Sequence, residues 1–135
     1  MAAVPVMVYD NIMDTLALET LGTIDRFNDA FNRQDLEAMA ALMTEDCVFE
    51  STAPSPDGTR FEGRDNIIEL FRDFFSGAKS RVFDSEDAFA AGYRATVRWI
   101  HRWVDLDGTE GHVRGVDVFT VRDGQIAEKL SYVKG

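Results

Sequence analysis

The sequence lacks several features that would assign it at once to a functional class. Its 135 residues contain one cysteine, Cys47, so no internal disulfide can form, and that thiol with two histidines makes no recognisable structural zinc pattern. Only 14 basic residues stand against 24 acidic ones, and the formal net charge of −10 disfavours nucleic acid and anionic membranes as partners.

Long apolar runs and phosphate loops are also missing. No stretch of about 18 uncharged apolar residues could span a membrane, and the first 14 residues carry no basic leader segment. No Gly-rich loop for a dinucleotide or a phosphate occurs. We therefore expect a cytoplasmic protein that works without a metal or a cofactor.

The length and the composition are typical of one globular domain. The chain is 45% hydrophobic and 28% charged and has only three prolines, which is far from disordered or collagen-like compositions. We assign residues 1–14 to an N-terminal extension and residues 15–135 to the domain.

Apolar spacing in the first half predicts three helices. The first, over residues 15–33, has one buried face marked by apolar residues at steps of three and four: Ala17, Leu21, Ile24, Phe27 and Phe31. A short second helix is expected after Asp35, a favourable N-cap residue, and a third begins near residues 63–65 and ends at 76–77. Between them, residues 47–51 predict a strand, and the Pro- and Gly-rich residues 52–59 predict an exposed loop.

The second half changes to a period of two from Arg81 onward. Turn signals at 91–92, 107–108 and 123–124 separate four predicted strands, which indicates an antiparallel meander. Helices followed by an antiparallel sheet predict an α+β fold in which the helices cover one face of the sheet.

Two titratable residues are predicted to face the space between helices and sheet. On the strand over residues 93–105, the odd positions include Val97, Trp99 and Trp103, so His101 lies on the covered face between two indole rings. On the next strand, turning Phe119 inward also turns Asp117 inward, and a buried carboxylate needs a donor or a cation. His101 is the partner that we predict for Asp117.

Five parts of the sequence share a pattern with a known family. They are the run Arg-Gly-Val-Asp-Val-Phe at 114–119, the turn Asp-Gly-Gln-Ile at 123–126, Tyr132, and the segments 24–35 and 42–50. Together they resemble the SnoaL-like branch of the nuclear transport factor 2-like superfamily. The resemblance covers nearly the whole chain after Asp14. It implies a cone-shaped fold, with about three helices on a strongly curved, mostly antiparallel sheet and a cavity between them.

The resemblance also implies which side chains face that cavity. It turns the last strand so that Lys129 and Ser131 face inward, whereas Ile126, Leu130 and Tyr132 face away.

Comparison with enzymes of the same fold narrows the chemistry. Asp117 falls where ketosteroid isomerases have the protonated aspartic acid of their oxyanion hole, but Phe27 and Ser51 replace their tyrosine and their general base. Trp99, His101 and Ser131 stand where limonene-epoxide hydrolases have an arginine and two aspartates. Both mechanisms are therefore disfavoured. Polyketide cyclases and related dehydratases share an Asp or His acid/base in an aromatic cavity, and the pair of His101 and Asp117 is similar to that arrangement.

We therefore expect a pocket protein for a small-molecule ligand or substrate, acting as a cofactor-free isomerase, cyclase or dehydratase. His101 and Asp117 are the predicted catalytic acid/base pair. The predicted lining of the pocket is Phe27, Phe31, Phe49, Ser51, Phe71, Trp99, Trp103, Phe119, Lys129 and Ser131.

Two alternatives stay open. In the first, His101 is a satisfied core residue and Asp117 forms an ion pair with Lys129. In the second, the protein is a non-catalytic ligand-binding or dimeric assembly module, which a closed pocket or a wide separation of His101 from Asp117 would favour.

The outward face of the sheet predicts that the protein associates with a second copy of itself. It combines the arginines at 94, 98 and 102 with apolar residues such as Val116 and Val118, and a face this apolar is seldom left in contact with water. We expect a homodimer formed through this outer face of the sheet, as the resemblance also implies.

Overall fold

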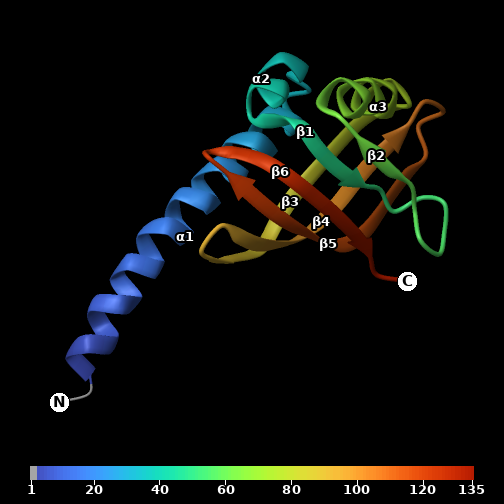
Figure 1. The fold of residues 1–135 in the computed structure, drawn as a ribbon. Coiled ribbons are helices and arrows are strands. Elements are labelled where there is room, and N and C mark those ends of the chain that lie inside the picture. The colour runs from blue at the N-terminus through green and yellow to red at the C-terminus, as the bar shows by residue number, and fades with distance from the viewer. Residues whose placement is uncertain (1–2) are drawn as a thin grey trace.

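The computed structural model describes residues 3–135, with side chains from residue 15 onward, and shows three helices and one curved sheet (Figure 1). The elements in chain order are α1 (Ala3–Asn32), α2 (Leu36–Ala41), β1 (Met43–Glu50), β2 (Arg60–Glu62), α3 (Arg64–Ser76), β3 (Ala78–Ala91), β4 (Arg94–Asp105), β5 (Glu110–Arg122) and β6 (Gln125–Val133). The α+β prediction is confirmed.

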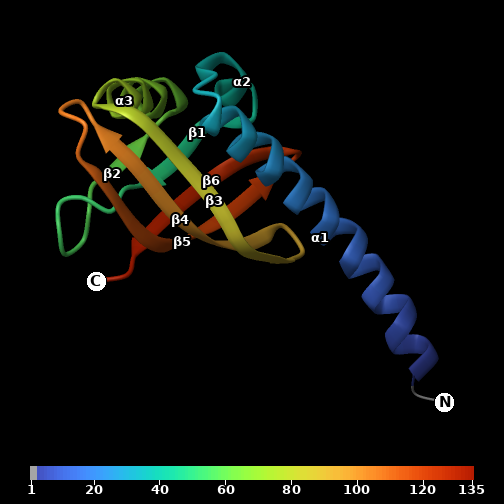
Figure 2. The same cartoon turned by 180° about the vertical axis from the view of Figure 1, so that it is seen from behind.

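The sheet has six strands in the order β2-β1-β6-β5-β4-β3. Strands β3 to β6 form the predicted antiparallel meander, and β1 pairs with β6 in parallel. In both views α2 and α3 lie at the same end of the sheet, while the N-terminal half of α1 extends beyond it (Figures 1 and 2). This curved sheet with helices on one face is the cone-shaped arrangement that the resemblance implied.

Two predicted boundaries need correction, and one short strand was missed. Helix α1 begins at Ala3 rather than at residue 15, so most of the predicted extension 1–14 is helical and only residues 1–2 lie outside the described residues. Strand β1 spans eight residues instead of the five predicted over 47–51. The three-residue β2, which pairs with the end of β1, was not predicted because a strand that short carries too little alternation to detect.

The residues predicted at the starts of the second and third helices are confirmed. The Asp35 side chain accepts a hydrogen bond from the Ala38 amide at 3.0 Å and so caps α2. Gly63 precedes α3 with a φ of 91°, a conformation that glycine adopts without strain.

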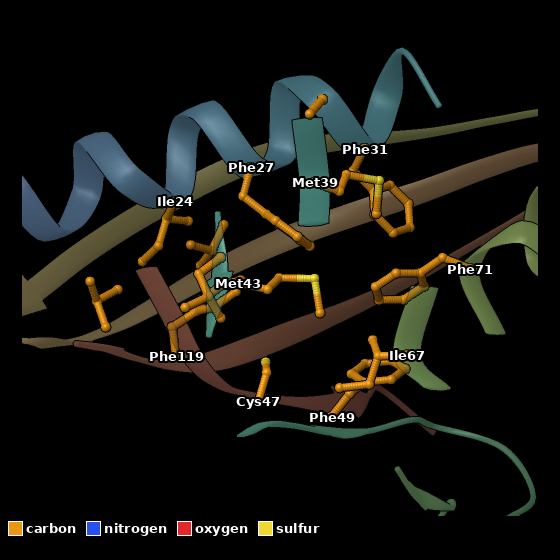
Figure 3. Packing of buried hydrophobic residues seen from close by; sticks show 14 of the residues in the cluster. Ile24, Phe27, Phe31, Met39, Met43, Cys47, Phe49, Ile67, Phe71 and Phe119 are labelled. Atoms are coloured by element: carbon orange, nitrogen blue, oxygen red, sulfur yellow. The ribbon is translucent and has the colours of Figure 1, made fainter. Parts of the chain in front are cut away.

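The core fills the space between α1, the two shorter helices and the inner face of the sheet (Figure 3). Phe27 and Ile24 from α1 and Phe119 from β5 are almost fully buried, together with Met39 of α2 and Ile67 of α3. Edge-to-face and tilted contacts join Phe31 to five other phenylalanines: Phe27, Phe71, Phe74, Phe75 and Phe83. Helix α3 therefore packs against α1 mainly through aromatic rings.

The last strand changes face partway along its length. Lys129 and Ser131 point inward as the resemblance implied, but Ile126 is 1% exposed and belongs to the core, so the prediction that it faces away is wrong. The pairing register of β5 with β6 shifts between Thr120 and Val121, as expected for a β-bulge, and one extra residue reverses the alternation.

Two glycines of β5 lie beneath the two indole rings of β4. Gly115 faces Trp99 and Gly111 faces Trp103 across the strand pair. A Cβ atom at Gly115 would lie 2.5 Å from the Trp99 ring and 2.3 Å from the Tyr132 carbonyl oxygen. The bare backbone of β5 therefore makes room for each ring on the neighbouring strand.

Candidate functional site

A small cavity lies between α1 and the inner face of β3, β4, β5 and β6. Its volume is ≈ 20 Å³, which is enough for about one water molecule and far below the several hundred cubic ångströms of a typical ligand pocket. Its lining is formed by Asn28, Phe31, Phe83, Ser85, Val97, Trp99, Asp117 and Lys129. The cavity is therefore too small for a substrate, although Ser85 on its lining is exposed.

Asp117 is the centre of a buried polar cluster. Its Oδ1 atom accepts a hydrogen bond from the Ser131 hydroxyl at 2.6 Å, and its Oδ2 atom lies 3.2 Å from the Lys129 ammonium nitrogen. Lys129 also donates to the Ser131 Oγ atom at 3.1 Å. The three side chains form a closed triangle from which bulk water is nearly excluded, since the side chains of Asp117 and Lys129 are only 6% and 11% exposed.

Strand register brings this triangle together. Asp117 lies opposite Ser131, and Phe119 lies opposite Lys129, across the β5–β6 pair. Residues two apart on a strand share a face, so the hydroxyl and the ammonium reach the same carboxylate. The Lys129 nitrogen also lies 4.7 Å from the centre of the Phe49 ring, where the ring face attracts the cation.

Burial of this ion pair bears on the stability and on the function of the protein. Each charge loses its hydration, and an apolar pair of the same volume would hold the fold equally well or better. The cluster is electrically balanced, with one carboxylate against one ammonium. The pair therefore places two opposite charges beside a cavity that is lined in part by aromatic rings.

His101 lies elsewhere, and the predicted dyad is not formed. Asp117 lies opposite Val97, four residues along β4 from His101, which corresponds to about 13 Å. The His101 ring stacks on Phe83 at 4.1 Å and 6°, and its Nε2 atom is buried without a hydrogen-bond partner among the described residues. The carboxylate is instead met by Lys129 and Ser131, which is the alternative that assigns His101 to the core.

The surroundings of His101 favour its neutral form. Burial lowers the pKa of the imidazole from 6.5 to about 4, and the nearby positive charge of Arg81 adds to that effect. Arg81 itself donates to the Phe74 carbonyl oxygen at 2.7 Å and lies over the Phe74 ring. Because Phe83 lies between this cluster and the cavity, His101 does not line the site.

Trp99 is a lining residue with a buried polar atom. Its side chain is 5% exposed, and its Nε1–H group has no hydrogen-bond partner among the described residues. Asp117 and Trp99 are diagonal neighbours on the same face of the β4–β5 pair, about 7–8 Å apart by backbone. A buried indole N–H without an acceptor lowers the stability of the fold.

The predicted lining is only partly correct. Phe31, Trp99 and Lys129 border the cavity, Ser131 bonds its carboxylate, and Phe49 contacts its cation. The other five predicted residues need correction. Phe27, Phe71 and Phe119 pack in the core, and Ser51 and Trp103 lie away from the cavity.

The reasons for these corrections are local. The Ser51 hydroxyl is used within its loop, where it donates to the Ala53 carbonyl oxygen at 2.9 Å. Trp103 lies over Gly111 and beside His101, nearer the other end of the strand.

Four lining residues were missed, namely Asn28, Phe83, Ser85 and Val97. Phe83 and Ser85 lie opposite His101 and Trp99 on β3, and their spacing of two was a usable signal that both share the inner face. The β4–β5 register was also readable. A hairpin centred on 107–108 places residue 101 opposite 113 or 114 rather than opposite 117.

The outer face of the sheet carries the predicted arginines. Arg102 pairs with Asp84 at 2.8 Å, and Arg114 pairs with Glu86. Ile100 also lies on this face yet is only 5% exposed, because the long side chains around it cover it. A hollow of ≈ 550 Å³ runs beside Arg98, Val116 and Tyr132, but it is open to solvent and contains no buried titratable group.

Among the residues that the structure describes, no three His, Cys, Asp or Glu side chains are grouped so as to hold a metal ion. No described helix has both the length and the apolar character needed to cross a bilayer.

The fold and the cavity define a protein of the cone-shaped class to which ketosteroid isomerase-like and nuclear transport factor 2-like proteins belong. More particularly, the SnoaL-like domain family matches residues 24–129, and the chain belongs to that family. No protein with a curated description matches it.

Several solved structures are similar to this one. A nuclear transport factor 2-like protein of unknown function from Mesorhizobium loti is 41% identical over 88% of this chain and 93% of its own, with a TM-score of 0.74. A candidate polyketide cyclase from Xanthomonas campestris pv. campestris is 23% identical over 88% and 93% of the two chains, with a TM-score of 0.78. An epoxide hydrolase of the limonene-epoxide hydrolase-like type from M. tuberculosis is 19% identical over 87% and 84%, with a TM-score of 0.75. The last two likenesses concern the fold alone.

Proposed function

We propose that this protein binds a compact small molecule in the cavity beneath α1 and exchanges a proton with it through Asp117. The observation that supports this most directly is the buried triangle of Asp117, Lys129 and Ser131, which borders the cavity. The reaction class is a cofactor-free isomerisation, cyclisation or dehydration of a carbonyl compound.

Asp117 would act as the base and Lys129 as its counter-charge. An ionised carboxylate has about four lone-pair sites, of which Ser131 and Lys129 occupy two, so acceptor capacity remains. A C–H bond next to the carbonyl breaks, its proton passes to an Asp117 oxygen, and the bonding electrons remain on the substrate as an enolate. Return of the same proton to another atom completes an isomerisation and restores the carboxylate.

Lys129 serves this step by its position. The ammonium lies beside the carboxylate in a site of low polarity, where its charge offsets the negative charge that moves from Asp117 onto the substrate. His101 has no part in the proposal, because its ring lies behind Phe83 and about four residues along β4 from the carboxylate.

The substrate needs an opening of the cavity, since ≈ 20 Å³ holds only a water molecule. The substrate would enter through the seam between α1 and the edge strand β3, because two residues that line the cavity there are accessible. Asn28 is half-buried and Ser85 is exposed. Asn32 closes the same seam by bonding both the N–H and the C=O group of Phe83 at 2.9 Å.

The test is deuterium incorporation from D₂O into a panel of small ketones and β-keto esters, followed by NMR. Wild-type protein should accelerate exchange of the hydrogens next to the carbonyl for at least one compound. Asp117→Asn should reduce that rate by about 100-fold or more, which is the usual contribution of a general base. Asp25→Asn, which changes an exposed aspartate of α1, is the matched control and should leave the rate unchanged.

A second function is favoured by the closed cavity and by the separation of His101 from Asp117. In that case the protein is a non-catalytic ligand-binding or assembly module. Saturable binding of a panel compound with no exchange above the Asp117→Asn background would establish this alternative and refute the catalytic proposal.

We also propose that two copies associate through the outer face of the sheet. Arginines and acidic residues alternate there, since Arg98 and Arg102 of β4 lie beside Asp84 and Glu86 of β3, and such a mixed surface can complement itself across a two-fold axis. Sedimentation should give a dimer for the wild type and a monomer for Val116→Glu, whereas Glu69→Ala on the exposed side of α3 should remain dimeric.

A further inference from the structure

The hollow on the outer face of the sheet is basic, although the protein as a whole is acidic. Basic residues outnumber acidic ones in its lining, which also has apolar and aromatic members: Arg98, Arg114, Lys134, Glu86, Val116, Tyr132 and Val133. The whole chain, by contrast, has a formal net charge of −10. Tyr132 and Val133 are 53% and 42% exposed, so apolar surface lies open beside the cations. The hollow therefore suits an occupant that is both acidic and apolar.

The projecting half of α1 has the complementary composition. The first 25 residues of the chain contain four acidic residues and no basic one. Apolar and aromatic residues recur there at steps of three and four, the spacing of one side of a helix: Val6, Tyr9, Met13 and Leu16. Asp10 and Asp14 each follow a member of this series, so acidic positions adjoin it along the helix.

This half of α1 does not reach the hollow of its own copy. Helix α1 leaves the sheet at the β3–β4 turn, where the Thr20 hydroxyl donates to the Gly92 carbonyl oxygen at 2.7 Å and Leu16 lies beside Gly92. Before Leu16 the helix extends past the sheet, and neither view shows a strand or another helix of the described chain beside it (Figures 1 and 2). The end of β6, where Tyr132 and Val133 line the hollow, lies at the opposite end of the molecule.

We propose that residues 3–14 of α1 from one copy lie in the outer-face hollow of a second copy, an inference that rests on the proposed association of two copies through this face. The dimensions agree. These residues span about 18 Å at about 1.5 Å per helical residue, and the hollow crosses strands β3 to β6, which is about 14 Å at about 4.8 Å between strands. A two-fold axis repeats the contact, so each copy supplies one helix and receives one.

Charge and apolar burial both favour this occupant. Glu86 forms its ion pair with Arg114 and feels Arg98 only at longer range, so the Arg98 charge is incompletely balanced within its own copy. An aspartate of the second helix supplies the opposite charge, and the apolar residues of that helix cover the exposed Tyr132 ring. A small free anion could also pair with Arg98, but it would leave the apolar part of the hollow in water.

Paramagnetic broadening between copies tests the contact directly. A nitroxide is attached to the full-length variant Met7→Cys, while Cys47 stays unlabelled because it is 1% exposed and burial raises the pKa of its thiol to about 11. This protein is mixed with ¹⁵N-labelled wild type that carries no nitroxide. The amide signals of Val116 and Val133 should lose most of their intensity and recover it when the nitroxide is reduced. Glu69→Cys, on the exposed side of α3, carries the control nitroxide and should leave both signals unchanged.

Charge reversal distinguishes docking of the helix from contact between the two sheets. Arg98→Glu should weaken dimerisation by about tenfold, because an attraction to the helix becomes a repulsion. Adding Asp10→Arg and Asp14→Arg to the same chain should restore most of the lost affinity, since the facing charges are again opposite. Arg72→Glu, on the exposed side of α3, is the control and should leave the affinity unchanged. Sedimentation of each full-length variant measures the dimer affinity.

The outcomes distinguish this inference from the proposed association. A dimer in which the amides of Val116 and Val133 keep their full intensity would refute docking of the helix and leave the contact between sheets standing. Broadening confined to α1 of the ¹⁵N-labelled copy would replace the proposal with pairing of the two helices. A wild type that stays monomeric at millimolar concentration would overturn both the docking and the association.

Discussion

The buried His101 makes a quantitative prediction about stability below neutral pH. Its pKa falls from 6.5 in an unfolded chain to about 4 in the fold, so between these values the unfolded chain binds a proton that the folded protein does not. The free energy of unfolding therefore decreases as the pH falls through this window. It is unaffected by this group above about pH 7.

The size of the effect follows from that difference in pKa. One pKa unit corresponds to about 1.4 kcal/mol, so His101 accounts for a loss of about 2 kcal/mol at pH 5 and about 3 kcal/mol at pH 4. Arg81 is the charged group that faces the ring, and its positive charge opposes the protonation throughout. At pH 5 most carboxylates are still ionised, which makes that pH the best point for the comparison.

The assay is urea unfolding of the wild type and of His101→Phe at pH 7 and pH 5. The variant keeps an aromatic ring against Phe83 and removes a buried nitrogen that has no partner, so it should be at least as stable as the wild type at pH 7. At pH 5 it should exceed the wild type by a further 2 kcal/mol or so. His112→Gln, which removes the exposed histidine of β5, should show the wild-type dependence. Parallel curves for wild type and His101→Phe would refute the reasoning.

Three further outcomes follow from packing and hydrogen bonds. Gly115→Ala should lower the free energy of unfolding by about 2–3 kcal/mol in thermal or urea unfolding, because the new Cβ atom would meet an indole ring and a backbone oxygen. Gly22→Ala, in the interior of α1 where a Cβ atom makes only an ordinary contact, should instead raise the free energy of unfolding by about 0.5–1 kcal/mol. Lys129→Met should lower the free energy of unfolding by about 3–5 kcal/mol, because it leaves the buried charge of Asp117 unpaired. The double variant Lys129→Met with Asp117→Leu should recover most of this loss, which urea unfolding of the wild type, the single variant and the double variant would show. Asn32→Ala should lower the free energy of unfolding by about 1–2 kcal/mol and speed hydrogen exchange at the Phe83 amide, to which Asn32 is bonded. Unchanged exchange at that amide would contradict the role of Asn32 in closing the seam between α1 and β3.

The fold could be predicted because its signals are local. Turn residues at 91–92, 107–108 and 123–124 and the alternation between them predicted four strands, and apolar spacing together with the Asp35 N-cap predicted the helices. The start of α1 was less accessible. The helix continues back to Ala3 with Pro5 in its first turn, where a proline is tolerated.

The site depended on longer-range information. Alternation showed correctly that His101 and Asp117 share the inner face, but face alone does not give the distance along a strand, which the register sets. The pairing of Asp117 with Lys129 across β5 and β6 depends on a bulge that sequence periodicity does not reveal. The cavity lining from β3 depended on which strand became the edge of the sheet, a property of the whole topology.

The long free edge at β3 has a consequence for how this protein behaves at high concentration. A strand of 14 residues with unpaired backbone groups would ordinarily recruit another strand and begin a fibril. Here Asn32 occupies the edge at Phe83, three acidic side chains follow at 84, 86 and 87, and an irregular register between Ser85 and Asp87 bends the strand. An edge that is occupied, charged and bent in this way should keep concentrated solutions clear, whereas loss of the two Asn32 bonds at Phe83 would open the strand to stacking into ordered aggregates.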